Sequence, residues 1–160
     1  MQFLKDFINN YLLISAIVSW LAAQICKVFT GIFRERQFSV ITLLTGTGGM
    51  PSSHSACVTS LAISSCLFFG LNSPEFAISA ILAVIVMRDA SGVRREAGKQ
   101  AKVLNQIIQE LFTTNDEKRF QTELKELLGH TPLQVFVGAL LGAVIAFALW
   151  PVYAPLAGAL

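Results

Sequence analysis

The sequence has few charged residues, and they are unevenly distributed. Asp, Glu, Lys and Arg make up 14% of the 160 residues, against roughly 25% in an average soluble domain. No charged residue lies between Gln37 and Pro74, and none follows Glu126. Uncharged apolar stretches of this length predict membrane spans, because roughly 20 apolar residues cross the hydrocarbon core. Helices are the expected form, since lipid cannot satisfy backbone polar groups.

Two other scarcities restrict the function. The net charge of +2 is too small to indicate nucleic-acid binding. The three cysteines are interpreted as small apolar helix residues, and Cys57 and Cys66 fall on opposite faces of one predicted helix, so they cannot pair within it. There is no strong cluster of metal-ligating residues, and we expect neither a metal nor another cofactor.

The predicted fold is an all-α polytopic membrane bundle in a single domain, residues 1–160. Its spans are expected at about 7–26, 53–71, 75–87 and 132–150. The first is interpreted as a retained span and not a cleaved signal peptide, because its apolar run is longer than a usual signal core and no clear cleavage site follows. Residues 38–50 are apolar but too short to span, and they could form a re-entrant or interfacial piece.

A polar, helical insert is predicted at 88–130. Apolar residues recur every three or four positions from Val93 to Leu111, which suggests an amphipathic helix lying against the membrane or the bundle. Thr114 and Glu117 fit a capping box for a second helix ending near Gly129.

The fourth span has clear start and packing signals. Thr131 can act as its N-cap, with Pro132 in the first helical position. Gly138, Gly142 and Ala146 recur every four residues, which allows close approach of a neighbouring helix.

The basic residues indicate an orientation. With four spans, residues 27–52 and 88–131 share one membrane face and hold eleven of the twelve Lys and Arg residues. The positive-inside rule predicts that this face is cytoplasmic and that both termini are outside.

Two histidines lie beside predicted helix starts on this charged face. Ser52 or Ser53 can cap the second span, with His54 in its first turn, and His130 precedes the fourth span. Helix N-termini present free N–H groups and partial positive charge, which suits an anion such as phosphate. Cations predicted at the same level are Lys27, Arg34 and Arg88.

Three short motifs resemble those of the type-two phosphatidic acid phosphatase superfamily, which includes lipid phosphatases and vanadium haloperoxidases. The motifs are Lys27-x6-Arg34, Pro51-Ser52-Ser53-His54, and His130-x3-Gln134 followed by Val135-x2-Gly138. Residues 87–105 further resemble a divergent bacterial and plant branch, described as acid phosphatase/vanadium-dependent haloperoxidase-related. The resemblance covers almost the whole chain.

The resemblance implies a role for each matching residue. His130 would attack phosphorus and form a phosphohistidine, and His54 would protonate the leaving oxygen. Gln134 would orient His130. The phosphoryl oxygens would be held by Lys27, Arg34, Ser52 and Ser53, with Arg88, Arg94 or Arg95 from the insert replacing a missing motif arginine.

The sequence departs from the superfamily motifs at several positions. Glu35 stands where proline follows the arginine, and Ser53 replaces a glycine. Leu124 stands where the third motif has its arginine, and Gln134 stands where an aspartate orients the nucleophile. A glutamine oxygen can fix the imidazole tautomer, but it cannot stabilise a positive ring as a carboxylate does, so activity could be weakened or lost.

Two hypotheses follow from this pattern. The first is a membrane phosphatase acting on a phosphomonoester or pyrophosphate of a lipid. The alternative is a non-catalytic membrane protein that binds lipid phosphate headgroups or a protein partner, which Gln134 and Leu124 favour. Membrane lipids are the expected partners, and self-association into a homo-oligomer is left open. A transporter has little support, because no span carries a charge in its middle.

Overall fold

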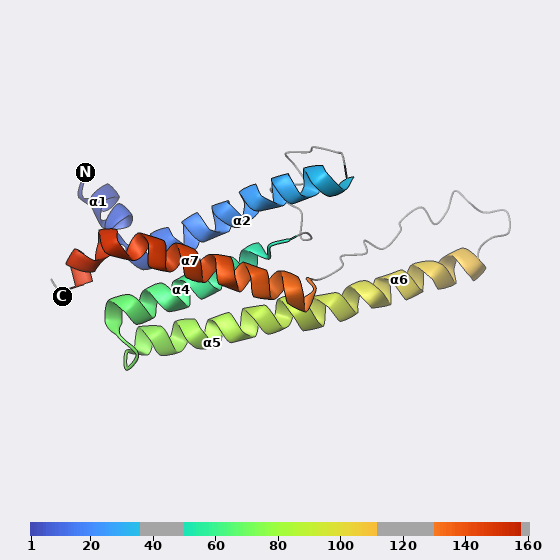
Figure 1. The fold of residues 1–160 in the computed structure, drawn as a ribbon. Coiled ribbons are helices and arrows are strands. Elements are labelled where there is room, and N and C mark those ends of the chain that lie inside the picture. Colours follow the sequence, from blue (N-terminus) through green and yellow to red (C-terminus); the bar gives the residue numbers. More distant parts are fainter. Residues whose placement is uncertain (36–49, 112–129, 158–160) are drawn as a thin grey trace.

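The computed structural model describes residues 1–35, 50–111 and 130–157, and within them it omits the side chains of 31–35, 93–95 and 108–111. The described elements are all helical (Figure 1). They are α1 (Gln2–Asn9), α2 (Tyr11–Glu35), α4 (Ser53–Phe69), α5 (Pro74–Arg88), a π-helical turn η1 (Asp89–Val93), α6 (Arg94–Leu111) and α7 (Pro132–Ala157). The predicted re-entrant piece and the second helix of the insert fall largely or wholly outside the described residues.

The predicted all-α membrane bundle is confirmed. Helices α2, α4, α5 and α7 lie side by side, and α4 packs against each of the other three (Figure 1). Three helical stretches in the described residues are long and apolar enough to cross a membrane, namely Tyr11–Thr30, Pro74–Ile107 and Pro132–Ala157. The fourth, Ser53–Phe69, is apolar but shorter. Its 17 residues rise about 25 Å.

The bundle interior is built from small residues, and the large apolar side chains face outward. Ser15, Ser19 and Ala23 recur every four residues on α2, and none is measurably exposed. Leu21 and Ile25, by contrast, are 46% and 56% exposed. This distribution suits lipid, which solvates large apolar side chains, so that helices associate through close contact of small residues.

The closest helix contact joins α4 and α7. A Cβ atom placed on Gly138 would collide with the carbonyl oxygen of Ser52, and one on Gly142 would collide with that of Ala56. Each step of four residues on α7 thus matches a step of four on α4, so the two helices run in parallel from a common end. This confirms the close approach predicted from the glycine spacing.

Aromatic side chains tie the opposite end of the bundle together. The Tyr11 hydroxyl donates to the Ala146 carbonyl at 2.6 Å, and the Tyr153 hydroxyl donates to the Ile8 carbonyl at 2.9 Å. The Tyr11 ring also stacks on that of Tyr153, with centroids 5.1 Å apart, and lies 5.6 Å from that of Trp150. These contacts hold α1 and α2 to the C-terminal part of α7.

The start of the first span differs from the sequence expectation. The helix is interrupted at Asn10, whose backbone is extended and separates α1 from α2. The Asn10 side-chain oxygen accepts the N–H of Leu13, so it caps the start of α2. The span therefore begins at Tyr11, and residues 7–9 belong to a separate short helix.

The predicted amphipathic helix is present as α6. It was expected to lie against the membrane or the bundle, and the second of these positions is wrong. Figure 1 shows α6 continuing the direction of α5 through η1 and extending past the end of the bundle, so it does not lie against the bundle. The third span also has no break at Met87, because the helical rod continues beyond it.

Candidate functional site

The structure brings the two histidines together at one end of the bundle. His54 lies in the first turn of α4, and His130 precedes Thr131 and the first residue of α7, Pro132. Their ring centroids are 6.3 Å apart, with an angle of 60° between the planes. His54 is exposed, whereas His130 is only 3% exposed. The pairing follows from the parallel packing of α4 and α7, which places both helix starts at the same level.

Gln134 connects the histidine to the start of α7. Its Oε1 accepts the backbone N–H of Thr131 at 2.9 Å, while the Thr131 hydroxyl accepts the backbone N–H of Gln134 at 3.3 Å. This is a reciprocal capping box, with glutamine in the third helical position. The same Oε1 lies 3.3 Å from His130 Nδ1.

The capping box determines the orientation of the glutamine amide. A backbone N–H can only donate, so the amide oxygen, and not its nitrogen, must face Thr131. Because that oxygen is also the atom nearest His130 Nδ1, Nδ1 must carry the proton in a neutral ring that makes this bond. The lone pair is then on Nε2, which is the tautomer a nucleophile needs.

A lysine reaches the start of α4 from the neighbouring helix. Lys27 Nζ donates to Ser53 Oγ at 3.2 Å, next to His54 in sequence. The Thr30 hydroxyl, one turn further along α2, donates to the Met50 carbonyl at 2.9 Å. These two bonds fix the segment before α4 against α2, so a cation of the first motif lies beside the second motif.

Ser52 stabilises the start of α4. Its side chain is fully buried, and its Oγ accepts the hydroxyl of Ser55 at 3.0 Å and the backbone N–H of Ser55 at 3.4 Å. It is therefore the N-cap of α4. Its backbone N–H donates to the Gln134 carbonyl at 3.0 Å, which joins the starts of α4 and α7 directly.

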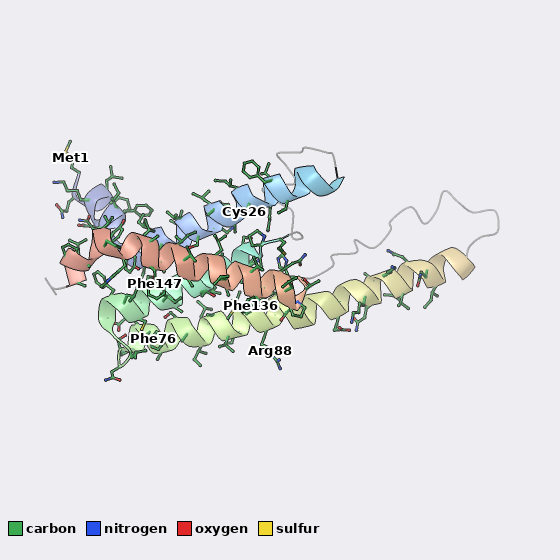
Figure 2. All side chains as sticks on the ribbon, in the orientation of Figure 1. Met1, Cys26, Phe76, Arg88, Phe136 and Phe147 are labelled. Atoms are coloured by element: carbon green, nitrogen blue, oxygen red, sulfur yellow. The ribbon has the colours of Figure 1, made fainter. Side chains whose placement is uncertain are left out.

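Of the four predicted arginines, only Arg88 has a side chain within the described residues. Arg88 is exposed at the end of α5, and its side chain points away from α7 (Figure 2). Arg34 lies in the last turn of α2, beyond Thr30, while Arg94 and Arg95 begin α6. The side chains of these three are outside the described residues, so their part in phosphate binding stays a prediction.

The electrostatics of this end favour an anion. The N-termini of α4 and α7 open beside each other, and each contributes a partial positive charge. Lys27 adds a full positive charge next to Ser53. Among the described residues, no three His, Cys, Asp or Glu side chains are grouped so that they could hold a metal ion. The arrangement is suited to a phosphoryl group.

Sequence reasoning missed two features of the site. The Thr131-x-x-Gln134 capping box was readable from the sequence, because it matches the general Ser/Thr-x-x-Glu/Gln pattern. The bond from the His130 backbone N–H to the Ala90 carbonyl, 3.0 Å long, had no sequence signal.

Comparisons with known proteins identify the family of the chain. The model of the Divergent PAP2 family matches residues 8–145, which include both histidines, Lys27 and Gln134. A relative from Bacillus subtilis (strain 168), described as "Uncharacterized membrane protein YuiD", is 43% identical over 153 residues, which cover 90% of this chain and 96% of the relative. No solved structure matches. The chain therefore belongs to the Divergent PAP2 family.

Proposed function

We propose that this membrane protein is a phosphatase that hydrolyses a phosphomonoester or pyrophosphate of a lipid through a phosphohistidine on His130. The observation that carries the proposal is the pair of imidazoles 6.3 Å apart at a common end of α4 and α7. One ring has its Nδ1 beside an amide oxygen, at 3.3 Å, which favours a nucleophilic Nε2. The other ring belongs to His54, whose side chain is exposed.

The proposed reaction has two balanced steps. The Nε2 lone pair of His130 forms a bond to phosphorus, the bond from phosphorus to the leaving oxygen breaks, and protonated His54 donates its proton to that oxygen. Water then attacks the phosphohistidine, His54 takes the water proton, and inorganic phosphate and His130 are released. Lys27 and the first N–H groups of α4 stabilise the phosphoryl oxygens.

The position of the site suits a lipid phosphate. Helix α4 rises about 25 Å, slightly less than the roughly 30 Å of a bilayer hydrocarbon core. His54, in its first turn, would then lie close to the boundary where lipid phosphates are found. We also propose that this end faces the cytoplasm, because it carries most of the Lys and Arg residues. Labelling of single cysteines placed at Ser73 and at Lys99, in a cysteine-free background, tests this orientation from each side.

The alternative is a protein that binds phosphate headgroups without turnover. Two observations favour it. Gln134 is neutral, so it cannot balance the positive charge that forms on His130 during phosphoryl transfer. In addition, His130 is 3% exposed, so a phosphoryl group could reach its Nε2 only after neighbouring groups move.

A phosphate-release assay separates the two functions. The purified protein in detergent is presented with a panel of phosphatidates and polyprenyl phosphates and pyrophosphates, without added metal. The phosphatase hypothesis predicts release that vanadate inhibits, and a loss of about a thousandfold or more in His130→Ala. Lys99→Ala, at an exposed ion pair with Glu96, is the matched control and should retain the rate.

The outcomes of this assay are distinct. An unchanged rate in His130→Ala contradicts the phosphohistidine mechanism. Saturable binding of a phosphorylated lipid with no release from any substrate supports the headgroup-binding alternative. In that case the His54→Ala and His130→Ala variants should bind more weakly than the Lys99→Ala control.

A further inference from the structure

The π-helical turn between α5 and α6 touches the site through a backbone atom. The turn η1 spans Asp89–Val93 and lies within the helical rod that α5 and α6 form (Figure 1). Within it, the Ala90 carbonyl oxygen accepts the backbone N–H of His130 at 3.0 Å. Ala90 and His130 are 4% and 3% exposed. A buried backbone bond therefore joins the rod to the residue proposed as nucleophile.

The bond pairs a carbonyl group of the π-turn with a buried N–H group that has no acceptor within a helix. The interior carbonyls of a regular α-helix are used by the helix's own hydrogen-bond ladder. A π-turn contains one extra residue and shifts that ladder, which is why such turns recur at functional sites. His130 precedes α7, so its N–H has no acceptor inside a helix, and a buried N–H group requires one. The Ala90 carbonyl supplies it.

We propose that η1 is a positioning element for His130. The Ala90 carbonyl holds its backbone, and Gln134 holds its ring through Nδ1. Gln134 is held in turn, because its carbonyl accepts the N–H of Ser52 at the start of α4. Three helical segments, η1, α7 and α4, are thereby linked to His130 directly or through Gln134. Only the effect of this positioning on catalysis rests on the proposed function; the effect on the geometry of His130 does not.

A consequence for α6 follows from chain continuity. Arg94, the first residue of α6, directly follows Val93, the last residue of η1. Helix α6 extends beyond the bundle as a continuation of the rod (Figure 1), so α6 and the Ala90 carbonyl belong to one continuous helical segment.

The test compares a variant that displaces the turn with one that does not. Ala90→Leu adds bulk at a buried position and should push η1 away from His130. Gly92→Ala is the matched control in the same turn, because a Cβ at Gly92 meets nothing within 4 Å. Amide hydrogen exchange of His130 in lipid nanodiscs reports the bond directly. The chain has two histidines, so a His54→Gln sample assigns the signals.

The expected results are specific. The His130 amide should be protected in the wild type and in Gly92→Ala, and should exchange about tenfold faster or more in Ala90→Leu, since an open amide loses its protection. The imidazole nitrogen shifts should move away from the tautomer with Nδ1 protonated in Ala90→Leu alone. Equal protection in all three proteins overturns the proposal. If Ala90→Leu does not fold, the exchange rate of the His130 amide in the wild type is the test. Rapid exchange of that amide also overturns the proposal.

Turnover gives a second, separable readout. If the wild type releases phosphate, Ala90→Leu should lower kcat by roughly ten- to a hundredfold, with a smaller change in KM, because misplacing a reacting group affects mainly the chemical step. A fall of the same size in Gly92→Ala overturns the positioning role. Absence of release from every substrate, together with the expected exchange pattern, contradicts the proposed function and leaves the positioning of His130 supported.

Discussion

The two ends of the bundle are held together by different means. At the histidine end, α4 and α7 meet backbone to backbone, through Gly138 and Gly142 and the bond from the Ser52 N–H to the Gln134 carbonyl. At the opposite end, the contacts come from large aromatic side chains around Tyr11 and Tyr153. Backbone contacts leave little freedom for adjustment, whereas ring contacts tolerate small shifts. The site is therefore built where the helix positions are most strictly determined.

Adding a single methyl group is expected to have its largest effect on stability where Gly142 of α7 contacts α4. Gly142→Ala places a Cβ against the Ala56 carbonyl, which is backbone and cannot turn aside. Overpacking of this kind typically costs about 1–3 kcal/mol, so the thermal midpoint in detergent should fall and the spacing of the histidines should increase. Gly92→Ala, in open space, is the control. Equal midpoints for the two variants would contradict the close backbone contact.

Gln134→Glu tests whether a negative charge beside His130 increases phosphate release at the histidine end. Glutamate keeps the Thr131 capping box and adds a negative charge beside His130. A hydrogen bond to a charged group is worth about 1 kcal/mol more than a neutral one, so phosphate release should increase roughly fivefold. Gln134→Met, with similar length and no acceptor oxygen, is the control and should lose activity. A rate in Gln134→Glu no higher than in the wild type would show that charge on this residue does not limit catalysis.

Two helix caps at opposite ends of the bundle provide a matched pair. The Thr131 hydroxyl caps α7 beside the site, and the Ser73 hydroxyl caps α5 at the far end by accepting the N–H of Phe76 at 3.1 Å. Each alanine variant should lose about 1 kcal/mol of stability. Only Thr131→Ala should alter the His130 nitrogen shifts, because Gln134 belongs to the Thr131 cap. A change of similar size in Ser73→Ala would remove the distinction between the ends.

The smallest effect on the site is expected from Tyr11→Phe. The variant removes the hydrogen bond to the Ala146 carbonyl but keeps the ring contacts. Loss of one hydrogen bond costs about 1 kcal/mol, which lowers the thermal midpoint by a few degrees. The histidine signals and any phosphate release should remain unchanged, because the site is held by backbone contacts at the other end. A changed histidine spectrum would show that the ends are coupled.

The parts of the fold that local sequence specifies were predictable. General capping chemistry predicts the helix starts at Ser52 and at Thr131-Pro132. A close helix contact is predicted by the four-residue spacing of Gly138, Gly142 and Ala146. These signals placed both histidines at the same end. The confirmed bundle follows from them and from the long uncharged runs.

The parts that depend on distant partners were not predictable. The start of the first span was placed too early, because the Asn10 cap is hidden within an apolar run. The π-turn at Asp89–Val93 was not predicted, since its Ala90 carbonyl is used by His130 from a distant segment. The extension of α6 in line with α5 likewise has no local signal, because an amphipathic pattern does not specify direction.

The most direct test of the central claim is a vanadate titration followed through the imidazole nitrogens of the two histidines. If His54 and His130 share one phosphoryl site, both sets of signals should move together with a single dissociation constant, and Lys27→Ala should weaken it. The signals of Lys99→Ala should follow those of the wild type. Movement of only one histidine, or two unrelated dissociation constants, would contradict a shared site.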